Sequence, residues 1–354
     1  MAIELDPLAS AEELGAQIAA VMHERPEGTA IIVQTTGSAG EPKRVGLNVD
    51  ALIASARATH GRLGGPGQWL LALPSHYVAG LQVWVRSLVA ETEPVILPGA
   101  HFEASEFVRA LGHMTGARNY TSLVPVQLQR LVELAEGDPG SAEAIAQLDA
   151  ILVGGQRLDA ALYDRAQRLG FSVVRTYGSS ETSGGCVYDG LPLDGVLVEI
   201  DDGEVLIGGH ILATEYVGNE QLTSERFMTR DGQRWYRTGD NGHFVDGALR
   251  VTGRRDRVII SGGFKISLDA LERIAAEQGL VSAAIGIPDE TWGERPVLFV
   301  EGLPVPEAET LLGLAVENEL GAFALPRIQH IEVLPRGATG KVDPEALRQR
   351  VSDA

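Results

Sequence analysis

The 354-residue chain contains one cysteine, Cys186, and no long apolar run. A single cysteine excludes an internal disulfide and a zinc site built from several cysteines. No segment approaches the roughly 18 apolar residues that a membrane-spanning helix requires, and residues 1–18 lack the basic start of a secretory signal. We therefore expect a cytoplasmic protein without membrane insertion.

Positive charge is also scarce. The chain has 29 Lys and Arg residues against 48 Asp and Glu, a formal net charge of -19. A surface with this balance argues against binding nucleic acid or an anionic membrane, so any anionic ligand must be held by a local basic site. We expect small-molecule partners.

Lysine is the rarest basic residue, with only Lys43, Lys265 and Lys341. Arginine supplies the rest of the positive charge. Each lysine stands in a segment that contains glycine, and a compact ammonium on a flexible stem can do chemistry that a planar guanidinium cannot. These segments are therefore candidates for contact with a phosphate or a reacting carboxylate.

The chain is long enough for two hydrophobic cores. Apolar runs bounded by turn residues alternate with helical patterns through most of its first half, which is typical of an α/β sheet covered by helices. The predicted strands are 30–34, 69–73, 94–97, 150–153 and 172–175, and the predicted helices are 10–22, 50–63, 104–115, 124–136 and 159–169.

The pattern changes after Gly195 to short strands separated by Asp-Gly pairs, which are hairpin signals. The pairs are Asp202-Gly203, Asp231-Gly232 and Asp246-Gly247. After a burst of charge at residues 254–257 we expect strands at 258–261, 283–287 and 296–301 and a helix at 268–278. We place a domain boundary near residue 255.

The loop Thr35-Thr36-Gly37-Ser38-Ala39-Gly40-Glu41-Pro42-Lys43 follows a predicted strand. Its hydroxyl groups, glycines and lysine can surround a polyphosphate with N–H groups and one ammonium. Pro42 stands where a Walker A loop has glycine, and the spacing of a dinucleotide-binding loop is absent. Taken alone, such a loop is more often a plain surface turn.

Four further segments follow in order: Tyr177-Gly178-Ser179-Ser180-Glu181-Thr182, Tyr236-Arg237-Thr238-Gly239-Asp240, Gly253-Arg254-Arg255-Asp256 and Pro335-Arg336-Gly337-Ala338-Thr339-Gly340-Lys341. Together with the loop they resemble the adenylate-forming superfamily of acyl-CoA synthetases, luciferases and peptide-synthetase adenylation domains. The resemblance covers residues from about 30 to 345. It implies an AMP-forming acid–thiol ligase that uses ATP, Mg²⁺ and CoA.

The resemblance also implies an architecture: a large N-terminal α/β domain with a β-rich subdomain (residues 1–255) and a small, mobile α+β C-terminal domain (residues 256–354). In this scheme Asp256 is the hinge. The mobile domain brings Lys341 to the substrate carboxylate and the α-phosphate in one pose, and a CoA tunnel lined by Ser261, Gly262, Gly263 and Lys265 in the other.

The resemblance assigns roles to further residues by position. Glu181 is the implied Mg²⁺ ligand and, with Thr36 and Lys341, a catalytic residue. Asp240 would accept both ribose hydroxyl groups. The remaining implied nucleotide-binding residues are Thr35, Thr36, Gly37, Ser38, Gly40, Lys43, Gly154, Gly155, Gln156, Tyr177, Gly178, Ser179, Ser180 and Arg254.

The chain departs from the family pattern in several places. Ala39 and Ser180 replace usual hydroxyl and threonine residues, and Asp343 stands near the position of a customary basic residue after Lys341. These departures could slow turnover, a question that the sequence leaves open. The phosphate loop also starts unusually early, so we expect a homodimer to cover the sheet face that a longer N-terminal region covers elsewhere.

Two segments bear on the acid substrate: Leu73-Pro74-Ser75-His76-Tyr77-Val78-Ala79-Gly80 with Arg86, and Thr121-Ser122-Leu123-Val124-Pro125 with Gln127-Leu128. Both resemble the o-succinylbenzoate–CoA ligases of menaquinone biosynthesis. The implied acid-binding residues are Ser75, His76, Tyr77, Gly80 and Arg86, with His76 first as reader of a second carboxylate. A surface salt bridge is the other interpretation of Arg86. Another aryl- or acyl-CoA ligase and a catalytically silent nucleotide-binding homologue remain open.

Overall fold

The computed structural model describes residues 2–35, 43–99, 101–337 and 342–352. The chain divides into two compact units. The larger consists of Met1–Asp201, Leu206–Thr238 and Phe244–Leu249; the smaller consists of Asp202–Val205, Gly239–His243 and Arg250–Ala354. The predicted α/β fold class is confirmed, whereas the exact boundary near residue 255 stays a prediction.

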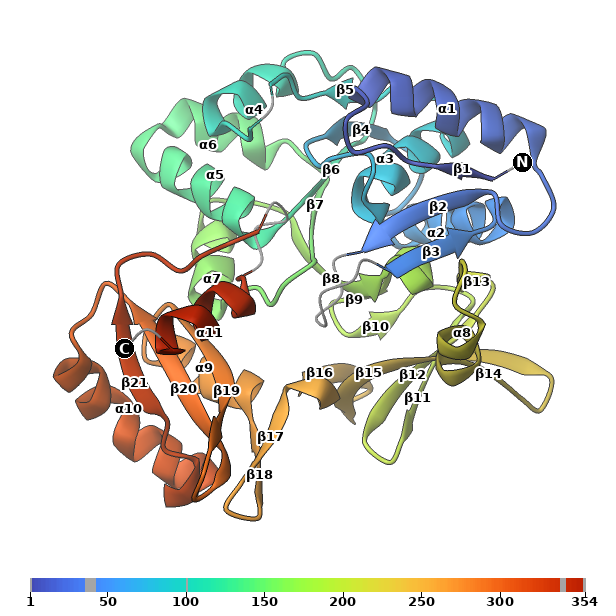
Figure 1. The fold of residues 1–354 in the computed structure, drawn as a ribbon. Helices are drawn as coiled ribbons and strands as arrows, with labels where there is room; N and C mark the ends of the chain where they lie inside the picture. The colour runs from blue at the N-terminus through green and yellow to red at the C-terminus, as the bar shows by residue number, and fades with distance from the viewer. Residues whose placement is uncertain (1, 36–42, 100, 338–341, 353–354) are drawn as a thin grey trace. The chain divides into compact units, whose positions relative to one another are not determined.

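The larger unit is built on a seven-stranded sheet of order β10-β9-β8-β7-β6-β4-β5 (Figure 1). Its strands are β4 (Gln68–Leu71), β5 (Val95–Ile96), β6 (Asn119–Leu123), β7 (Ala150–Val153), β8 (Val173–Ser179), β9 (Gly184–Tyr188) and β10 (Leu191–Pro192). Strands β5, β4, β6, β7 and β8 are parallel, and β9 and β10 continue the sheet antiparallel.

Helices cover both faces of this sheet. One face packs on a core with α4 (Ala104–Leu111), α5 (Pro125–Gly137), α6 (Pro139–Ala146) and α7 (Ala160–Arg168). Leu123 points into this core while its neighbour Ser122 meets α3 (Val78–Val89), as the alternation of a strand requires. α3 packs against α2 (Val49–Arg62) and α1 (Ala11–Glu24) on the second face.

A second sheet has the order β1-β2-β3-β13, with β1 (Ile3–Glu4), β2 (Ile31–Thr35), β3 (Lys43–Leu47) and β13 (Glu215–Tyr216). The antiparallel register of β2 and β3 places Thr35 opposite Lys43. Thus the two ends of the predicted phosphate loop are held side by side. β13 pairs with the other edge of β3 and places Tyr216 opposite Val45.

The predicted β-rich region is a sheet of order β11-β12-β15-β14, with β16 paired to β15. Its strands are β11 (Val196–Asp201), β12 (Glu204–Gly209), β14 (Phe227–Arg230), β15 (Gln233–Val245) and β16 (Ala248–Arg254), and α8 (Glu220–Arg226) precedes β14. All three Asp-Gly pairs lie between strands with positive φ at both residues, for example 47° at Asp202 and 77° at Gly203. This confirms the predicted hairpins, and positive φ at both residues is typical of type I′ turns.

The C-terminal part of the smaller unit is a sheet of order β18-β17-β20-β19, with β21 paired to β20. Its strands are β17 (Val258–Ser261), β18 (Phe264–Ser267), β19 (Ser282–Asp289), β20 (Gly293–Glu301) and β21 (Arg327–Ile331). Helices α9 (Leu268–Glu277) and α10 (Val305–Leu320) pack on one core, and α11 (Pro344–Ser352) contacts β19.

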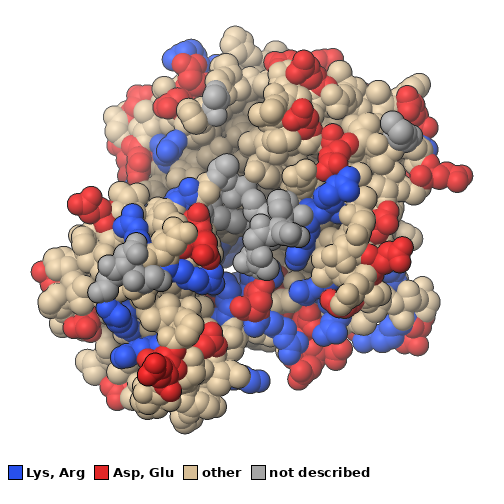
Figure 2. Space-filling model, in the orientation of Figure 1, with Lys and Arg blue, Asp and Glu red and all other residues tan. Residues whose placement is uncertain are grey.

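The predicted helices are all present, although α4 ends at Leu111 rather than Thr115 because Gly112 caps it. Among the described residues, no helix is both long and apolar enough to span a bilayer. Acidic and basic side chains are interspersed over the face drawn in Figure 2. This mixture agrees with the expectation that an anionic ligand is held locally.

Candidate functional site

The predicted site segments of the larger unit follow the carboxyl ends of adjacent parallel strands. Ser75 comes after β4, Gly154 after β7, and Glu181 after β8 in the short helix η1 (Ser180–Thr182). These strands are neighbours in the order β8-β7-β6-β4, so their carboxyl ends lie along one edge of the sheet. In open α/β sheets this edge is where ligands bind.

Two glycines at this edge have no room for a side chain. A Cβ on Gly154 would lie 2.3 Å from Thr176 Oγ1, and one on Gly178 would lie 2.1 Å from the carbonyl oxygen of Gly184. Thr176 Oγ1 also donates to the carbonyl of Val153. The segment 154–156 and the Tyr177-Gly178 pair, both implied nucleotide-binding segments, thereby lie side by side.

Glu181 is buried close to β3, the strand that begins at Lys43. It is 7% exposed, and its Oε1 accepts a hydrogen bond from Tyr216 Oη at 2.7 Å. Lys43 Nζ lies 5.9 Å from the centre of the Tyr216 ring. The pairing of β3 with β13 therefore joins two predicted residues through Tyr216, which sequence reasoning did not identify.

Several predicted residues lie outside the described part of the chain: Thr36, Gly37, Ser38 and Gly40 of the phosphate loop, and Lys341. Their roles stay predictions. The described flanks are well placed: Thr35 faces Lys43 in the β2–β3 ladder. In the smaller unit, Arg336 and Val342 form an antiparallel bridge around the segment that carries Lys341.

The predicted acid-binding segment runs into α3. Ser75 is buried and its Oγ accepts a hydrogen bond from Trp84 Nε1, while the His76 and Tyr77 rings lie 4.1 Å apart. Burial lowers the pKa of His76, so its imidazole is a neutral hydrogen-bonding group near pH 7. A Cβ on Gly80 would lie 2.2 Å from the carbonyl oxygen of Pro74, which fixes the tight entry into the helix.

Arg86 is buried on α3, so the interpretation as a surface salt bridge was wrong. It is 3% exposed; its Nη1 and Nη2 lie 3.4 Å from Ser122 Oγ and Tyr188 Oη, and its guanidinium lies over the Trp69 ring. Nε has no hydrogen-bond partner, and no described carboxylate pairs with the group. Burial and the charge of Arg86 lower the pKa of His60 to about 4.

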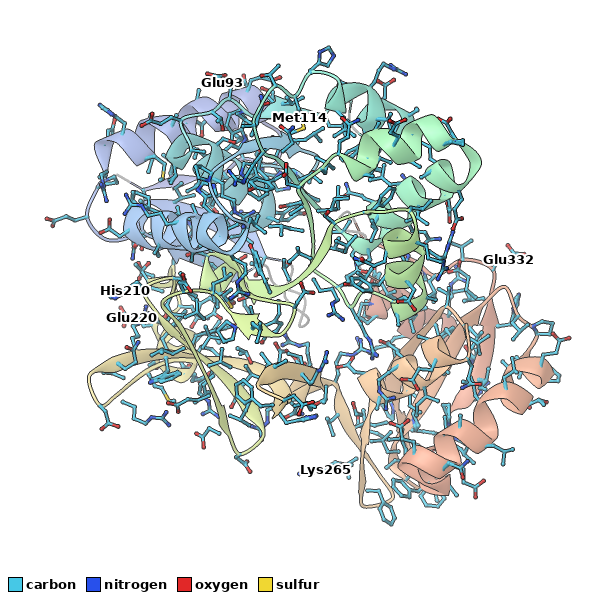
Figure 3. All side chains as sticks on the ribbon, turned by 180° about the vertical axis from the view of Figure 1, so that it is seen from behind. Glu93, Met114, His210, Glu220, Lys265 and Glu332 are labelled. Carbon is cyan, nitrogen blue, oxygen red and sulfur yellow. The ribbon has the colours of Figure 1, made fainter. Side chains whose placement is uncertain are left out.

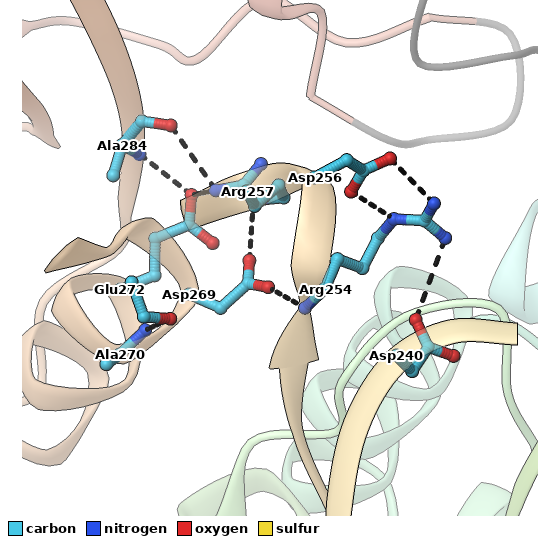
Figure 4. A network of polar contacts seen from close by, with 9 residues as sticks. Asp240, Arg254, Asp256, Arg257, Asp269, Ala270, Glu272 and Ala284 are labelled. Carbon is cyan, nitrogen blue, oxygen red and sulfur yellow. Dashed lines mark hydrogen bonds and ion pairs between the residues drawn. The ribbon is translucent and has the colours of Figure 1, made fainter. Parts of the chain in front are cut away.

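In the smaller unit, Arg254 joins two predicted carboxylates (Figure 4). Its Nε and Nη2 donate to both oxygens of Asp256 at 2.8 and 2.7 Å, and its Nη1 lies 3.7 Å from Asp240 Oδ1. Arg254 and Asp256 thus form an ion pair. The geometry brings the predicted ribose acceptor, nucleotide-binding arginine and hinge together.

Helix α9 anchors both sides of Asp256. Asp269 accepts a hydrogen bond from the Arg254 main-chain N–H and pairs with Arg257, whose Nη2 also donates to Glu272. A Cβ on Gly253 would lie 2.7 Å from Asp269 Oδ2. Burial raises the pKa of Glu272, an effect that the neighbouring Arg257 charge opposes. The residues flanking Asp256 are consequently fixed to one helix.

The segment predicted to line a CoA tunnel is the turn between β17 and β18. Ser261 is buried, Gly262 and Gly263 have φ values of 57° and 86°, and the Gly262 N–H donates to the carbonyl of Trp292. Lys265 is exposed on the same hairpin (Figure 3). Glycine adopts these two consecutive positive φ values without strain, and it leaves the turn with little side-chain bulk.

Comparison with known proteins bears on this arrangement. The model of the AMP-binding enzyme family matches residues 3–216. A probable 2-succinylbenzoate–CoA ligase of Mycobacterium tuberculosis is 41% identical over 335 residues, 92% of this chain and 85% of the relative. A 2-succinylbenzoate–CoA ligase of Listeria monocytogenes is 31% identical and is covered to 70%.

A solved structure, o-succinylbenzoate CoA synthetase of Bacillus subtilis in complex with its acyl-adenylate intermediate, has a TM-score of 0.76 at 25% identity. The alignment covers 93% of this chain and 70% of that structure. The predicted resemblance is therefore confirmed by family model, relatives and fold. The chain belongs to the AMP-binding enzyme family.

Proposed function

We propose that this chain is an ATP-dependent CoA ligase that converts o-succinylbenzoate to its acyl-adenylate and then to the CoA thioester. The 41% identity over nearly the whole chain to a relative named for this activity carries the proposal. The site agrees, because the acid-binding segment leads into α3, which carries a buried cation, Arg86. AMP and pyrophosphate are the expected by-products.

The residues around Glu181 fit a magnesium ion that arrives with ATP. Glu181 is a buried carboxylate without a described basic partner, and Mg²⁺ is typically held by one or two carboxylates together with substrate phosphates and water. Among the described residues, no group of three or more His, Cys, Asp or Glu side chains could hold a metal ion. Binding through one carboxylate together with substrate phosphates does not need such a group. A bound Mg²⁺ would neutralise phosphate charge during attack on the α-phosphate.

The chain's own residues supply the remaining steps. Lys43 and the phosphate loop hold the β- and γ-phosphates, and Asp240 accepts the ribose hydroxyl groups beside Arg254. Lys341 stabilises the negative charge that gathers as the acid carboxylate attacks phosphorus. We further propose that Asp256 is the hinge on which the C-terminal domain moves, and that Gly262 and Gly263 admit the thiol arm of CoA.

The second carboxylate of o-succinylbenzoate must find a donor when it is buried. An unpaired buried anion costs several kcal/mol, and an unpaired buried guanidinium carries a similar penalty. Arg86 offers a charged fork with a free Nε, whereas His76 offers a neutral ring. We therefore propose Arg86 as the main reader of this carboxylate and His76 as a hydrogen-bonding contributor, directly or through water.

A product assay tests the proposed function. Purified protein with Mg-ATP, CoA and o-succinylbenzoate should yield the aryl-CoA thioester, AMP and pyrophosphate. A panel of aryl and acyl monocarboxylic acids, tested by ATP–pyrophosphate exchange, measures selectivity. Release of ADP and phosphate, or preference for a monoacid, would contradict the proposal; no exchange with any acid would indicate a silent nucleotide-binding homologue.

Replacing the buried guanidinium tests the acid pocket. We expect Arg86→Met to raise KM for o-succinylbenzoate at least tenfold, about 1.4 kcal/mol, while KM for ATP stays nearly constant. The methionine keeps the packing volume and removes the charge. His76→Ala is expected to act in the same direction with a smaller effect.

Arg175→Met is the matched control, because Arg175 is an exposed arginine of the same unit that pairs with Asp189. It should leave both KM values unchanged. Normal handling of the diacid by Arg86→Met would exclude Arg86 as the reader, and an equal loss of ATP affinity would indicate a structural role.

A further inference from the structure

The contact between Tyr216 and Glu181 has the features of a positioning pair. Glu181 Oε1 accepts the Tyr216 hydroxyl at 2.7 Å, and no described basic side chain lies within ion-pair distance of the carboxylate. Ala213 N–H donates to the Glu181 main-chain oxygen, so the backbone is fixed as well. One carboxylate oxygen is therefore held by a neutral donor, and Oε2 remains for a ligand.

Tyr216 is itself rigidly held. It is buried on β13, its backbone pairs with Val45, and its ring lies 5.8 Å from that of Phe227. The adjoining segment is tied down by Arg234, whose guanidinium donates to the carbonyl oxygens of Ala213 and Thr214. Burial, strand pairing and ring packing therefore fix the position of the Tyr216 hydroxyl group.

The donor to Glu181 Oε1 is a neutral hydroxyl group. A lysine in this place would instead neutralise the carboxylate and compete with an incoming cation.

We propose that Tyr216 is a positioning residue that holds the Glu181 carboxylate by Oε1 and keeps Oε2 for the metal ion of the metal–ATP complex. Groups that hydrogen-bond a metal-ligating carboxylate fix its orientation, and their loss typically weakens metal binding 10- to 100-fold. The inference rests on the proposed function, because it presumes that ATP brings a divalent cation to Glu181.

Removing the hydroxyl group alone tests this role. Tyr216→Phe keeps the aromatic ring, which lies near Lys43 and Phe227. We expect Mn²⁺ affinity, measured by electron paramagnetic resonance with α,β-methylene-ATP present and no acid, to fall about tenfold or more. ATP–pyrophosphate exchange should recover when Mg²⁺ is raised, while affinity for AMP without metal stays unchanged.

Tyr120→Phe is the matched control. Tyr120 also carries a hydroxyl group on a buried ring, and it donates to the carbonyl oxygens of Leu63 and Gly65, away from Glu181. It should lower the thermal midpoint without changing Mn²⁺ affinity. Metal affinity within twofold of wild type in Tyr216→Phe, or an equal loss of Mn²⁺ and AMP binding, would overturn the proposal.

The test separates this inference from the proposed function because no acid is present. Tenfold weaker Mn²⁺ binding by Tyr216→Phe supports the positioning role even if the product assay shows that the wild type activates another acid. Absence of nucleotide-dependent Mn²⁺ binding in the wild type would overturn the positioning role together with the metal site.

Discussion

Glu181→Gln is expected to lower kcat/KM for ATP in adenylate formation by about 100-fold or more, without lowering the thermal midpoint. A carboxylate that holds the metal contributes several kcal/mol of charge stabilisation, and an amide is a poor substitute. The stability expectation follows from the structure. Glutamine can still accept the Tyr216 hydrogen bond, and it removes a buried charge that no described basic group balances.

Glu204→Gln provides the contrast. Glu204 is also buried, but it accepts the Gly239 N–H at 3.0 Å and lies 3.4 Å from Arg255 Nη1. Glutamine removes the buried charge that the Gly239 N–H and Arg255 both hold, so this variant should melt at a lower temperature. Only Glu204→Gln should therefore lower the thermal midpoint, and only Glu181→Gln should impair adenylate formation with metal–ATP.

Calorimetry and ATP–pyrophosphate exchange measure the two effects. A Glu181→Gln variant that exchanges pyrophosphate at the wild-type rate would exclude Glu181 as the metal ligand. If the thermal midpoint of Glu181→Gln falls as far as that of Glu204→Gln, the Glu181 carboxylate stabilises the fold. That result would contradict its assignment as a cation ligand.

The sequence predicted the elements whose local signals are strong. Alternating apolar runs located β2, β4 and β7, and three Asp-Gly pairs located the hairpins, because these patterns depend on neighbouring residues only. β6 was not predicted. Its residues Asn119–Leu123 contain a polar Thr-Ser pair, whose members are buried only because helices cover both faces of the sheet.

In the site, too, local sequence patterns were predictable and long-range contacts were not. Segments with glycine and hydroxyl residues in a fixed order were recognisable, and the sheet places those after β7 and β8 together. Tyr216 was missed because it lies 35 residues beyond Glu181 in the chain, and only the pairing of β13 with β3 brings it there. Helical spacing could not predict the burial of Arg86 either, because that burial depends on Trp69, Ser122 and Tyr188 from three strands.

Lys341→Ala is expected to reduce adenylate formation by about 100- to 1,000-fold, the effect of removing one positioned donor worth roughly 2.7–4 kcal/mol. Thioester formation from pre-made acyl-adenylate should stay largely intact. In the proposed mechanism the lysine contacts the reacting groups only in the first half-reaction. Rapid-quench measurement of each half-reaction separates the two, and equal loss of both would assign Lys341 a structural role.

Gly263→Trp tests the second half-reaction, thioester formation, as Lys341→Ala tests the first. A bulky side chain at the β17–β18 turn should block CoA use and spare pyrophosphate exchange. Because φ at Gly263 is 86°, tryptophan also strains the turn, so Gly263→Asn is needed as a control that tolerates positive φ with little bulk. If the asparagine variant uses CoA normally and the tryptophan variant does not, the block is steric. If Lys341→Ala and Gly263→Trp impair the same half-reaction, the proposed two-pose mechanism is wrong.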